Sequence, residues 1–104
     1  MRRFGQHATL KPEKRAAYIE LHANVWPEVL QLISDCHLSN YSIYLMGDEL
    51  YAYFEYTGSD YEADMKRMDE SGIMQAWWKH TKPCFLHHER RQYYADMHEI
   101  FHLC

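Results

Sequence analysis

The last seven residues contain a spacing that is typical of zinc hydrolases. The run from His98 to His102 reads HEIFH and fits H-E-x-x-H. On a helix this spacing sets two histidines one turn apart on one face, with the glutamate beside the metal. The chemistry would be metal-assisted hydrolysis, so it requires residues 97–102 to form a helix.

The local pattern in this segment is compatible with a helix and with a strand. Helical spacing is seen at Met97, Ile100, Phe101 and Cys104. Strand alternation is seen at Met97, Glu99, Phe101 and Leu103. In a strand the two histidines would lie about 13 Å apart, because each residue advances the chain by about 3.3 Å. One zinc ion, with nitrogen ligands at about 2.0–2.1 Å, cannot bridge them. The order of elements along the chain must therefore decide whether residues 97–102 form a helix or a strand.

A second group of residues could carry out acid–base chemistry without a metal. Tyr18 and His22 in YIELHANVWPE lie four residues apart, on one face of an expected helix. A histidine with a pKa near neutrality can accept or donate a proton at working pH. Each candidate also has an ordinary interpretation. An isolated helix histidine is usually a surface or half-buried residue, Tyr41 fits a sheet aromatic, and one of Trp77 and Trp78 would pack in the core.

The pair His87-His88 beside Glu89 is a weaker metal candidate. Arg90 and Arg91 follow directly, and their positive charge disfavours a cation there. We therefore expect no designed metal site in this segment. No Ser-His-Asp spacing, Gly-rich phosphate loop or nucleophilic cysteine pairing stands out elsewhere.

Length and composition indicate one folded domain spanning residues 1–104, with a hydrophobic fraction of 47%. The net charge is −4 and the basic residues are scattered, so we expect no nucleic-acid partner. No apolar run is long enough to cross a bilayer, and the start lacks a secretory signal, so we expect no membrane association. Three cysteines without C-x-x-C spacing favour free thiols in a reducing cytoplasm.

Periodicity predicts alternating strands and helices. Residues 2–10 alternate as a strand, and helical spacing follows over residues 11–26, restarting at Pro27. NYSIYLM and LYAYFEY form a hairpin around Gly47-Asp48-Glu49. A third helix is capped by Ser59 or Asp60 and a fourth contains IMQAWWKHT, followed by a loop over residues 83–92 and the final run.

This order predicts an α+β fold on the ferredoxin-like split βαβ plan, with a four-stranded antiparallel sheet. The plan requires the final run to be a strand, so HEIFH is interpreted as a chance match. LYAYFEY is apolar or aromatic on both faces. Helices cover only one face of such a sheet, so a second subunit or a ligand pocket should cover the other.

Four segments together resemble the L-rhamnose mutarotase family of small dimeric aldose-anomer isomerases: YIELHANVWPE, NYSIYL, QAWWKHT and MHEIFHL. The resemblance runs from Arg3 to the last expected strand. It implies a ferredoxin-like homodimer of the dimeric α+β barrel type, with a sugar pocket beside each sheet and residues 97–102 on the last strand. It also implies that His22 is the proton donor and that the sugar is contacted by Tyr18, Tyr41, Trp77 and Trp78.

Anomer exchange by these residues needs no cofactor. The cyclic hemiacetal opens to the aldehyde and recloses on the other face, with one proton delivered to the ring oxygen and one removed from the anomeric hydroxyl. His22 suits either role, and its partner could be Tyr41, Tyr18 or a bound water. The first strand, with His7, and the loop with His87-His88 depart from the better-known members. The substrate is therefore expected to be L-rhamnose, with L-fucose or a related aldose as the alternative. A non-catalytic small-molecule-binding dimer and the zinc hydrolase are the competing hypotheses.

Overall fold

The computed structural model describes residues 1–86 and 94–104 and has four strands in one antiparallel sheet. They are β1 (Arg2–Thr9), β2 (Leu38–Met46), β3 (Glu49–Tyr56) and β4 (Ala95–Met97), in the spatial order β2-β3-β1-β4. The order places the first and last strands side by side, as the split βαβ plan requires. The predicted α+β fold with a four-stranded antiparallel sheet is confirmed.

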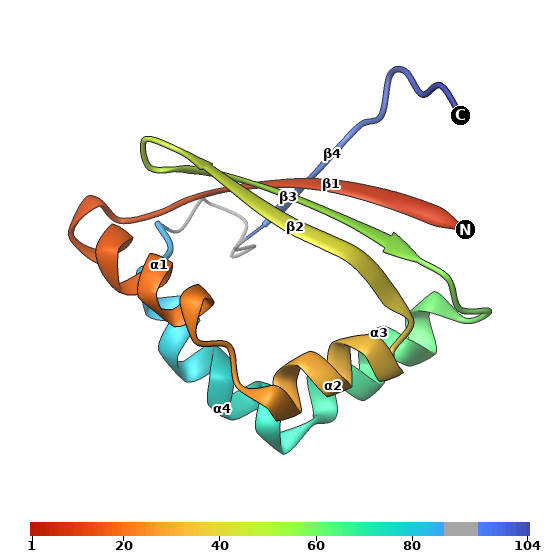
Figure 1. The fold of residues 1–104 in the computed structure, drawn as a ribbon, viewed down its shortest axis with the longest axis horizontal. Helices are drawn as coiled ribbons and strands as arrows, with labels where there is room; N and C mark the ends of the chain where they lie inside the picture. The colour runs from red at the N-terminus through yellow and green to blue at the C-terminus, as the bar shows by residue number, and fades with distance from the viewer. Residues whose placement is uncertain (87–93) are drawn as a thin grey trace.

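All four helices lie against one face of this sheet (Figure 1). They are α1 (Arg15–Ala23), α2 (Pro27–Asp35), α3 (Tyr61–Glu70) and α4 (Gly72–Thr81). Short 3-10 turns at Pro12–Lys14 and Lys82–Cys84 lead into α1 and out of α4. Pro27 occupies the first turn of α2, as predicted, because its missing N–H has no partner to lose there. The Asp60 side chain accepts a hydrogen bond from the Ala63 N–H at 3.1 Å and so caps α3.

The β2–β3 hairpin turns at Gly47, whose φ of +60° is a conformation that favours glycine. The register of β2 against β3 shifts between Ser39 and Ser42. Asn40 lies within this irregularity and has a φ of 49°. Such a bulge re-aims the side chain beside it, and here that side chain is Tyr41.

Strand alternation separates a helix-facing side of the sheet from an outer side. On β3, Leu50, Ala52, Phe54 and Tyr56 are buried, whereas the intervening residues are half-buried. Ala52 lies opposite Gln6 of β1 in the register. The helix-facing side therefore carries the core, and it also forms the wall of a cavity.

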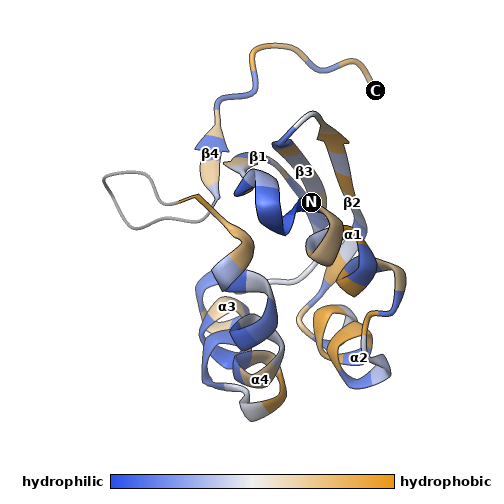
Figure 2. Cartoon of the chain, turned by 90° about the vertical axis from the view of Figure 1, so that its left-hand side faces the viewer, coloured by the Kyte–Doolittle hydropathy of each residue, from blue (hydrophilic) through white to orange (hydrophobic). Residues whose placement is uncertain are grey.

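The core consists of two clusters along the helix-facing side. The larger lies beneath α2, α3 and α4 and includes Val29, Phe54, Met68 and Trp77. The smaller lies beside α1 and includes Ala8, Leu10, Tyr18, Leu50 and Phe85. The helices carry both hydrophilic and hydrophobic residues along their turns (Figure 2). Burial of one stripe per helix accounts for the predicted helical spacing.

The last strand is shorter than expected. β4 pairs only with residues 5–7 of β1 and ends at Met97, and residues 98–104 have no regular secondary structure. The prediction that residues 97–102 form the last strand is therefore wrong beyond Met97. The chain leaves the sheet there and runs past it (Figure 1), held by an ion pair of 2.7 Å between Arg3 and Glu99. The helix that H-E-x-x-H needs does not form at these residues.

The expected loop over residues 83–92 begins with ordered structure. Cys84 ends the second 3-10 turn, and Phe85 forms an isolated bridge with Leu10. The remainder of that loop, residues 87–92, lies outside the described residues. Within residues 1–86 and 94–104, no helix combines the length and apolar character needed to cross a membrane.

Candidate functional site

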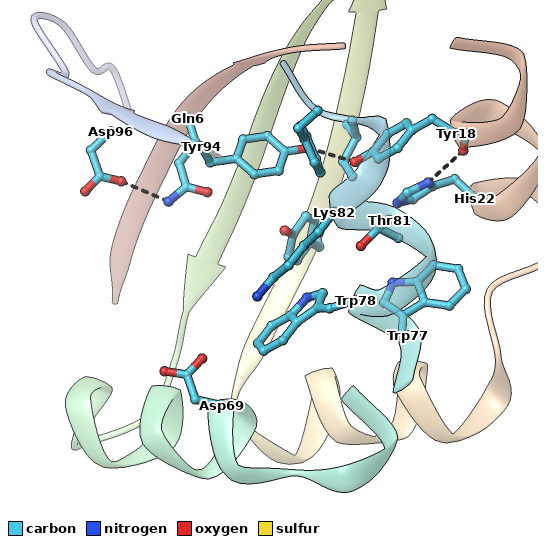
Figure 3. Close-up of a pocket in the computed structure, with 13 residues that line it drawn as sticks. Gln6, Tyr18, His22, Asp69, Trp77, Trp78, Thr81, Lys82, Tyr94 and Asp96 are labelled. Atoms are coloured by element: carbon cyan, nitrogen blue, oxygen red, sulfur yellow. Dashed lines mark hydrogen bonds between the residues drawn. The ribbon is translucent and has the colours of Figure 1, made fainter. Parts of the chain in front are cut away.

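A cavity of about 580 Å³ lies between the helix-facing side of the sheet and helices α1 and α4 (Figure 3). It is lined by all five residues that the family resemblance assigned to the site: Tyr18, His22, Tyr41, Trp77 and Trp78. They come from α1, β2 and α4, so the fold brings together segments far apart in the chain. Eight further residues complete the lining: Gln6, Ile43, Asp69, Thr81, Lys82, Phe85, Tyr94 and Asp96.

The imidazole of His22 is oriented by its own helix. Its Nδ1 lies 2.9 Å from the backbone carbonyl oxygen of Tyr18, one turn earlier (Figure 3). A carbonyl oxygen can only accept, so Nδ1–H is the donor in this bond. In the neutral ring the other nitrogen, Nε2, then carries a lone pair. The hydrogen bond between His22 and the residue one helical turn earlier therefore leaves Nε2 of His22 as the proton acceptor.

The surroundings of His22 favour this neutral form. Its ring lies 4.2 Å from the Tyr18 ring and meets the edge of Trp77 at 5.8 Å, measured between centroids. Burial among these rings lowers the pKa of His22 below its ordinary value, and the hydrogen bond to the Tyr18 carbonyl opposes this only in part. At neutral pH His22 is thus uncharged and ready to take a proton.

The Tyr18 hydroxyl lies 2.9 Å from the hydroxyl of Tyr94, and the two form a hydrogen-bonded pair. Burial raises the pKa of Tyr18 far above its ordinary value, and the neighbouring Tyr94 adds a smaller contribution in the same direction. Burial also raises the pKa of Tyr94, against the opposing effect of the bond to Tyr18. Both hydroxyls therefore stay protonated and act as neutral hydrogen-bonding groups rather than as bases.

Tyr41 reaches the cavity from the irregular part of β2 and stacks on Phe54, with ring centroids 5.2 Å apart. The residue as a whole is 40% exposed, but protein surrounds its hydroxyl end. Burial of that end raises the pKa of Tyr41, with further contributions from Tyr94 and Tyr61. Tyr41 is therefore also a neutral donor near neutral pH.

The two adjacent tryptophans have different environments. Trp77 is 5% exposed and packs edge-on against Trp26, with centroids 5.2 Å apart, as well as against His22. Trp78 is half-buried, and the Lys82 ammonium lies 4.6 Å from its ring centroid. Trp77 is thus part of the core wall behind His22, whereas Trp78 is partly accessible where it lines the cavity.

A second, apolar cavity of about 400 Å³ adjoins the first. The two share five residues: His22, Tyr41, Ile43, Trp77 and Trp78. The second adds aliphatic and thioether side chains, most of them from α2, α3 and α4. A ligand contacting His22 would thus meet a polar wall on one side and an apolar wall on the other. Apolar walls with a few convergent polar groups are typical of small-molecule sites.

Sequence reasoning missed six polar residues of the lining: Gln6, Asp69, Thr81, Lys82, Tyr94 and Asp96. Gln6 was visible only as one position in an alternating strand, without a chemical motif around it. Tyr94 and Asp96 belong to the short segment at β4, whose position depends on pairing with β1 rather than on local pattern. The one signal available in the sequence was a polar residue at a strand position expected to face the helices.

No metal-binding group is present in the part of the chain that the structure describes. There, no three His, Cys, Asp or Glu side chains come close enough to hold an ion together. His98 and His102 lie in the irregular segment after β4. The weak candidate at His87-His88, with its flanking residues, lies outside the described residues.

Comparisons with known proteins all match one family. The family model for L-rhamnose mutarotase matches residues 3–103. L-rhamnose mutarotases of Oceanobacillus iheyensis and Lactiplantibacillus plantarum are 31% and 30% identical, in each case covering 99% of both chains. The crystal structure of an L-rhamnose mutarotase from Formosa agariphila superimposes with a TM-score of 0.80, at 23% identity and 99% coverage of both chains. That structure supports the fold.

We predict that the His22 ring titrates below its ordinary pKa of about 6.5 and that the neutral ring carries its proton on Nδ1. Because unfolding restores the ordinary pKa, His22 stabilises the fold above about pH 6.5, and this contribution is lost as the pH falls through that value and then through the lower folded pKa. Heteronuclear NMR of the ring nitrogens measures both the pKa and the tautomer. A pKa above 6.5, or a proton on Nε2 in the neutral form, would contradict this account.

Proposed function

The chain belongs to the L-rhamnose mutarotase family of carbohydrate isomerases, and we propose that it interconverts the α and β anomers of L-rhamnose by opening and reclosing the pyranose hemiacetal. The observation that carries the proposal is the convergence of Tyr18, His22, Tyr41 and the tryptophan pair 77–78 on one cavity. Three of the four segments that resemble the family contribute these side chains: YIELHANVWPE, NYSIYL and QAWWKHT. Aldose-sized ligands fit a cavity of about 580 Å³.

In the proposed mechanism His22 acts first as the base. Nε2 takes the proton of the anomeric hydroxyl, the bond between C1 and the ring oxygen breaks, and C1 becomes an aldehyde carbon. The ring oxygen gains a proton and becomes a hydroxyl. The aldehyde then rotates, and the hydroxyl attacks its other face while it returns its proton to the group that supplied it. Protonated His22 donates its proton to the carbonyl oxygen in this closing step, so the same group serves as proton donor.

Water is the favoured source of the proton for the ring oxygen. Tyr18, Tyr41 and Tyr94 all have raised pKa values, so giving up a proton would leave a costly tyrosinate. Their hydroxyls instead hold the sugar by neutral hydrogen bonds. The Trp78 face contacts the C–H face of the ring, and the adjoining apolar cavity suits the methyl group of a 6-deoxy sugar.

We predict that His22→Gln folds and binds the sugar but loses mutarotation. Gln retains a hydrogen-bonding side chain but cannot exchange a proton near neutral pH. A positioned general acid or base contributes roughly 10²–10⁴ in rate, equivalent to about 3–5.5 kcal/mol of barrier. Saturation-transfer NMR on L-rhamnose at anomeric equilibrium measures the exchange rate directly, and a panel of other aldoses measures preference.

The matched control is His80→Gln on α4, because His80 is exposed and does not line the cavity. It should leave the exchange rate unchanged. Retention of the wild-type rate within about threefold by His22→Gln, with complete loss in Tyr41→Phe, would reassign the proton chemistry to the strand tyrosine. Sugar binding by the wild type without any acceleration of exchange would favour the non-catalytic binding module instead.

We predict different defects for the two tryptophans. Trp78→Ala should raise the KM for the sugar more than it lowers kcat, because stacking holds the ground and transition states alike. Trp77→Ala should destabilise the fold by about 3–5 kcal/mol, as expected for removing a core aromatic residue. Chemical denaturation and exchange kinetics on both variants separate the effects. Equal losses of stability in the two would refute this division of roles.

A homodimer through the outer side of the sheet is part of the proposal. No helix of residues 1–86 or 94–104 covers that side (Figure 1). Tyr44 and Met46 on β2 are 66% and 69% exposed there, and Met97 on β4 is 43% exposed. The segment after β4 carries more exposed apolar residues (Figure 2): Ile100, Phe101 and Leu103. Exposed apolar side chains on a sheet side that no helix covers are typical of an interface.

We predict that the protein sediments as a dimer at micromolar concentration and that the double substitution Tyr44→Glu and Met46→Glu shifts it to monomer. Two buried carboxylates at a symmetric interface would meet the same charges of the second subunit. Ile19→Glu provides the control, because Ile19 is 46% exposed but lies on α1, on the helical side. A wild-type monomer at these concentrations would exclude the proposed assembly.

The proposal also places the protein in a reducing compartment, the cytoplasm. Its thiols at Cys36, Cys84 and Cys104 are free, and the first two are buried. Burial raises the pKa of both buried thiols, which keeps them protonated and unreactive.

A further inference from the structure

We propose that Gln6 and Asp96 form a second recognition element, which reads the hydroxyl groups of the sugar on the side of the ring opposite the anomeric carbon. This inference rests on the proposed function and concerns its substrate preference. Figure 3 shows the pair at one end of the cavity and His22 at the other. Tyr18, His22 and Trp77 lie toward the other end (Figure 3).

Strand pairing places the two side chains together. Gln6 of β1 and Asp96 of β4 are direct partners in the antiparallel register, so both side chains project from the same, helix-facing side. The Gln6 Nε2 donates a hydrogen bond of 2.9 Å to Asp96 Oδ1. The partner of Gln6 on its other flank is Ala52, whose small side chain leaves space beside the amide.

The pair has two oxygen atoms left to bind a ligand. Among residues 1–86 and 94–104, neither the Gln6 amide oxygen nor Asp96 Oδ2 has a hydrogen-bond partner. Asp96 is exposed and Gln6 half-buried, so a ligand in the cavity can reach both oxygens. An ionised carboxylate and an amide oxygen can only accept, so the matching ligand groups are donors such as sugar hydroxyls.

The position of the pair selects which hydroxyls it meets. The reacting C1 must lie at His22 Nε2, and C4 lies across a pyranose ring from C1. A group at the far end of the cavity therefore faces the hydroxyl on C4 and the one on its neighbour C3. L-rhamnose and L-fucose have opposite configurations at C4. The Gln6–Asp96 pair is thus placed to distinguish L-rhamnose, the expected substrate, from L-fucose, the alternative.

The hydrogen bond within the pair makes this discrimination stricter. It holds both side chains in one geometry before the sugar binds, which reduces the entropy lost on binding. A hydroxyl of the wrong configuration would leave the carboxylate oxygen without a donor after its water is displaced. Sites built to bond a hydroxyl reject ligands that cannot supply it more strongly than apolar pockets reject a size difference.

The test compares L-rhamnose with two epimers, 6-deoxy-L-talose at C4 and 6-deoxy-L-glucose at C2, by saturation-transfer NMR. In Asp96→Asn the shape is kept, but an amide can replace the free acceptor by a donor. We expect the KM for L-rhamnose to rise about tenfold or more, with kcat within about threefold. The preference in kcat/KM for L-rhamnose over the C4 epimer should fall by a similar factor, and the preference over the C2 epimer should stay within about threefold.

Asp35→Asn is the matched control, because Asp35 is exposed at the end of α2 and lies outside the cavity. Gln6→Leu supplies a second variant with the same expected direction if Asp96→Asn does not fold. Unchanged KM and unchanged C4 discrimination in a folded variant, beside a wild type that accelerates L-rhamnose exchange, would overturn this inference alone. A wild type without such acceleration would overturn the proposed function itself.

Discussion

The pairing of β1 with β3 is the constraint on which the rest of the structure depends. The two strands stay in register from Arg2 opposite Tyr56 to Thr9 opposite Glu49. Because side chains alternate along a strand, a slip of one residue would turn every core residue to the outer side. The same register sets the small Ala52 beside Gln6, which lines the cavity. One hydrogen-bonded ladder thus determines both where the core packs and where a ligand can enter.

Burial then sets the protonation states at the site. Aromatic rings around His22 lower its pKa, while the same dry surroundings raise the pKa values of Tyr18 and Tyr41. All three groups are consequently neutral near pH 7, and only His22 can take a proton easily. The hydrogen bond from its Nδ1 to the Tyr18 carbonyl decides which nitrogen does so. Backbone geometry of a single helical turn therefore selects the reacting atom.

The sequence allowed prediction of whatever depends on local pattern. Alternation and helical spacing gave the element order, the hairpin around Gly47, and the face shared by Tyr18 and His22. It failed where position depends on distant pairing. β4 has three residues, too few for periodicity to define, and its end at Met97 follows from the limited stretch of β1 that it pairs with. Tyr94 and Asp96 were missed for the same reason, and the different environments of Trp77 and Trp78 follow from packing that a dipeptide does not encode.

The open form of the cavity suits the proposed reaction. Anomer exchange proceeds through an aldehyde that is stable in water, so the site has no reactive intermediate to protect from solvent, unlike enzymes that must close a lid. Solvent can instead supply the proton that the raised tyrosine pKa values make costly to obtain from the protein. What the protein must provide is a neutral base at a fixed position and a sugar held so that C1 meets it. The buried Trp77 serves the first requirement by packing behind His22. The half-buried Trp78 and the hydrogen-bonding groups at the other end of the cavity serve the second. Rate and sugar preference can therefore change separately, because they depend on opposite ends of the same cavity.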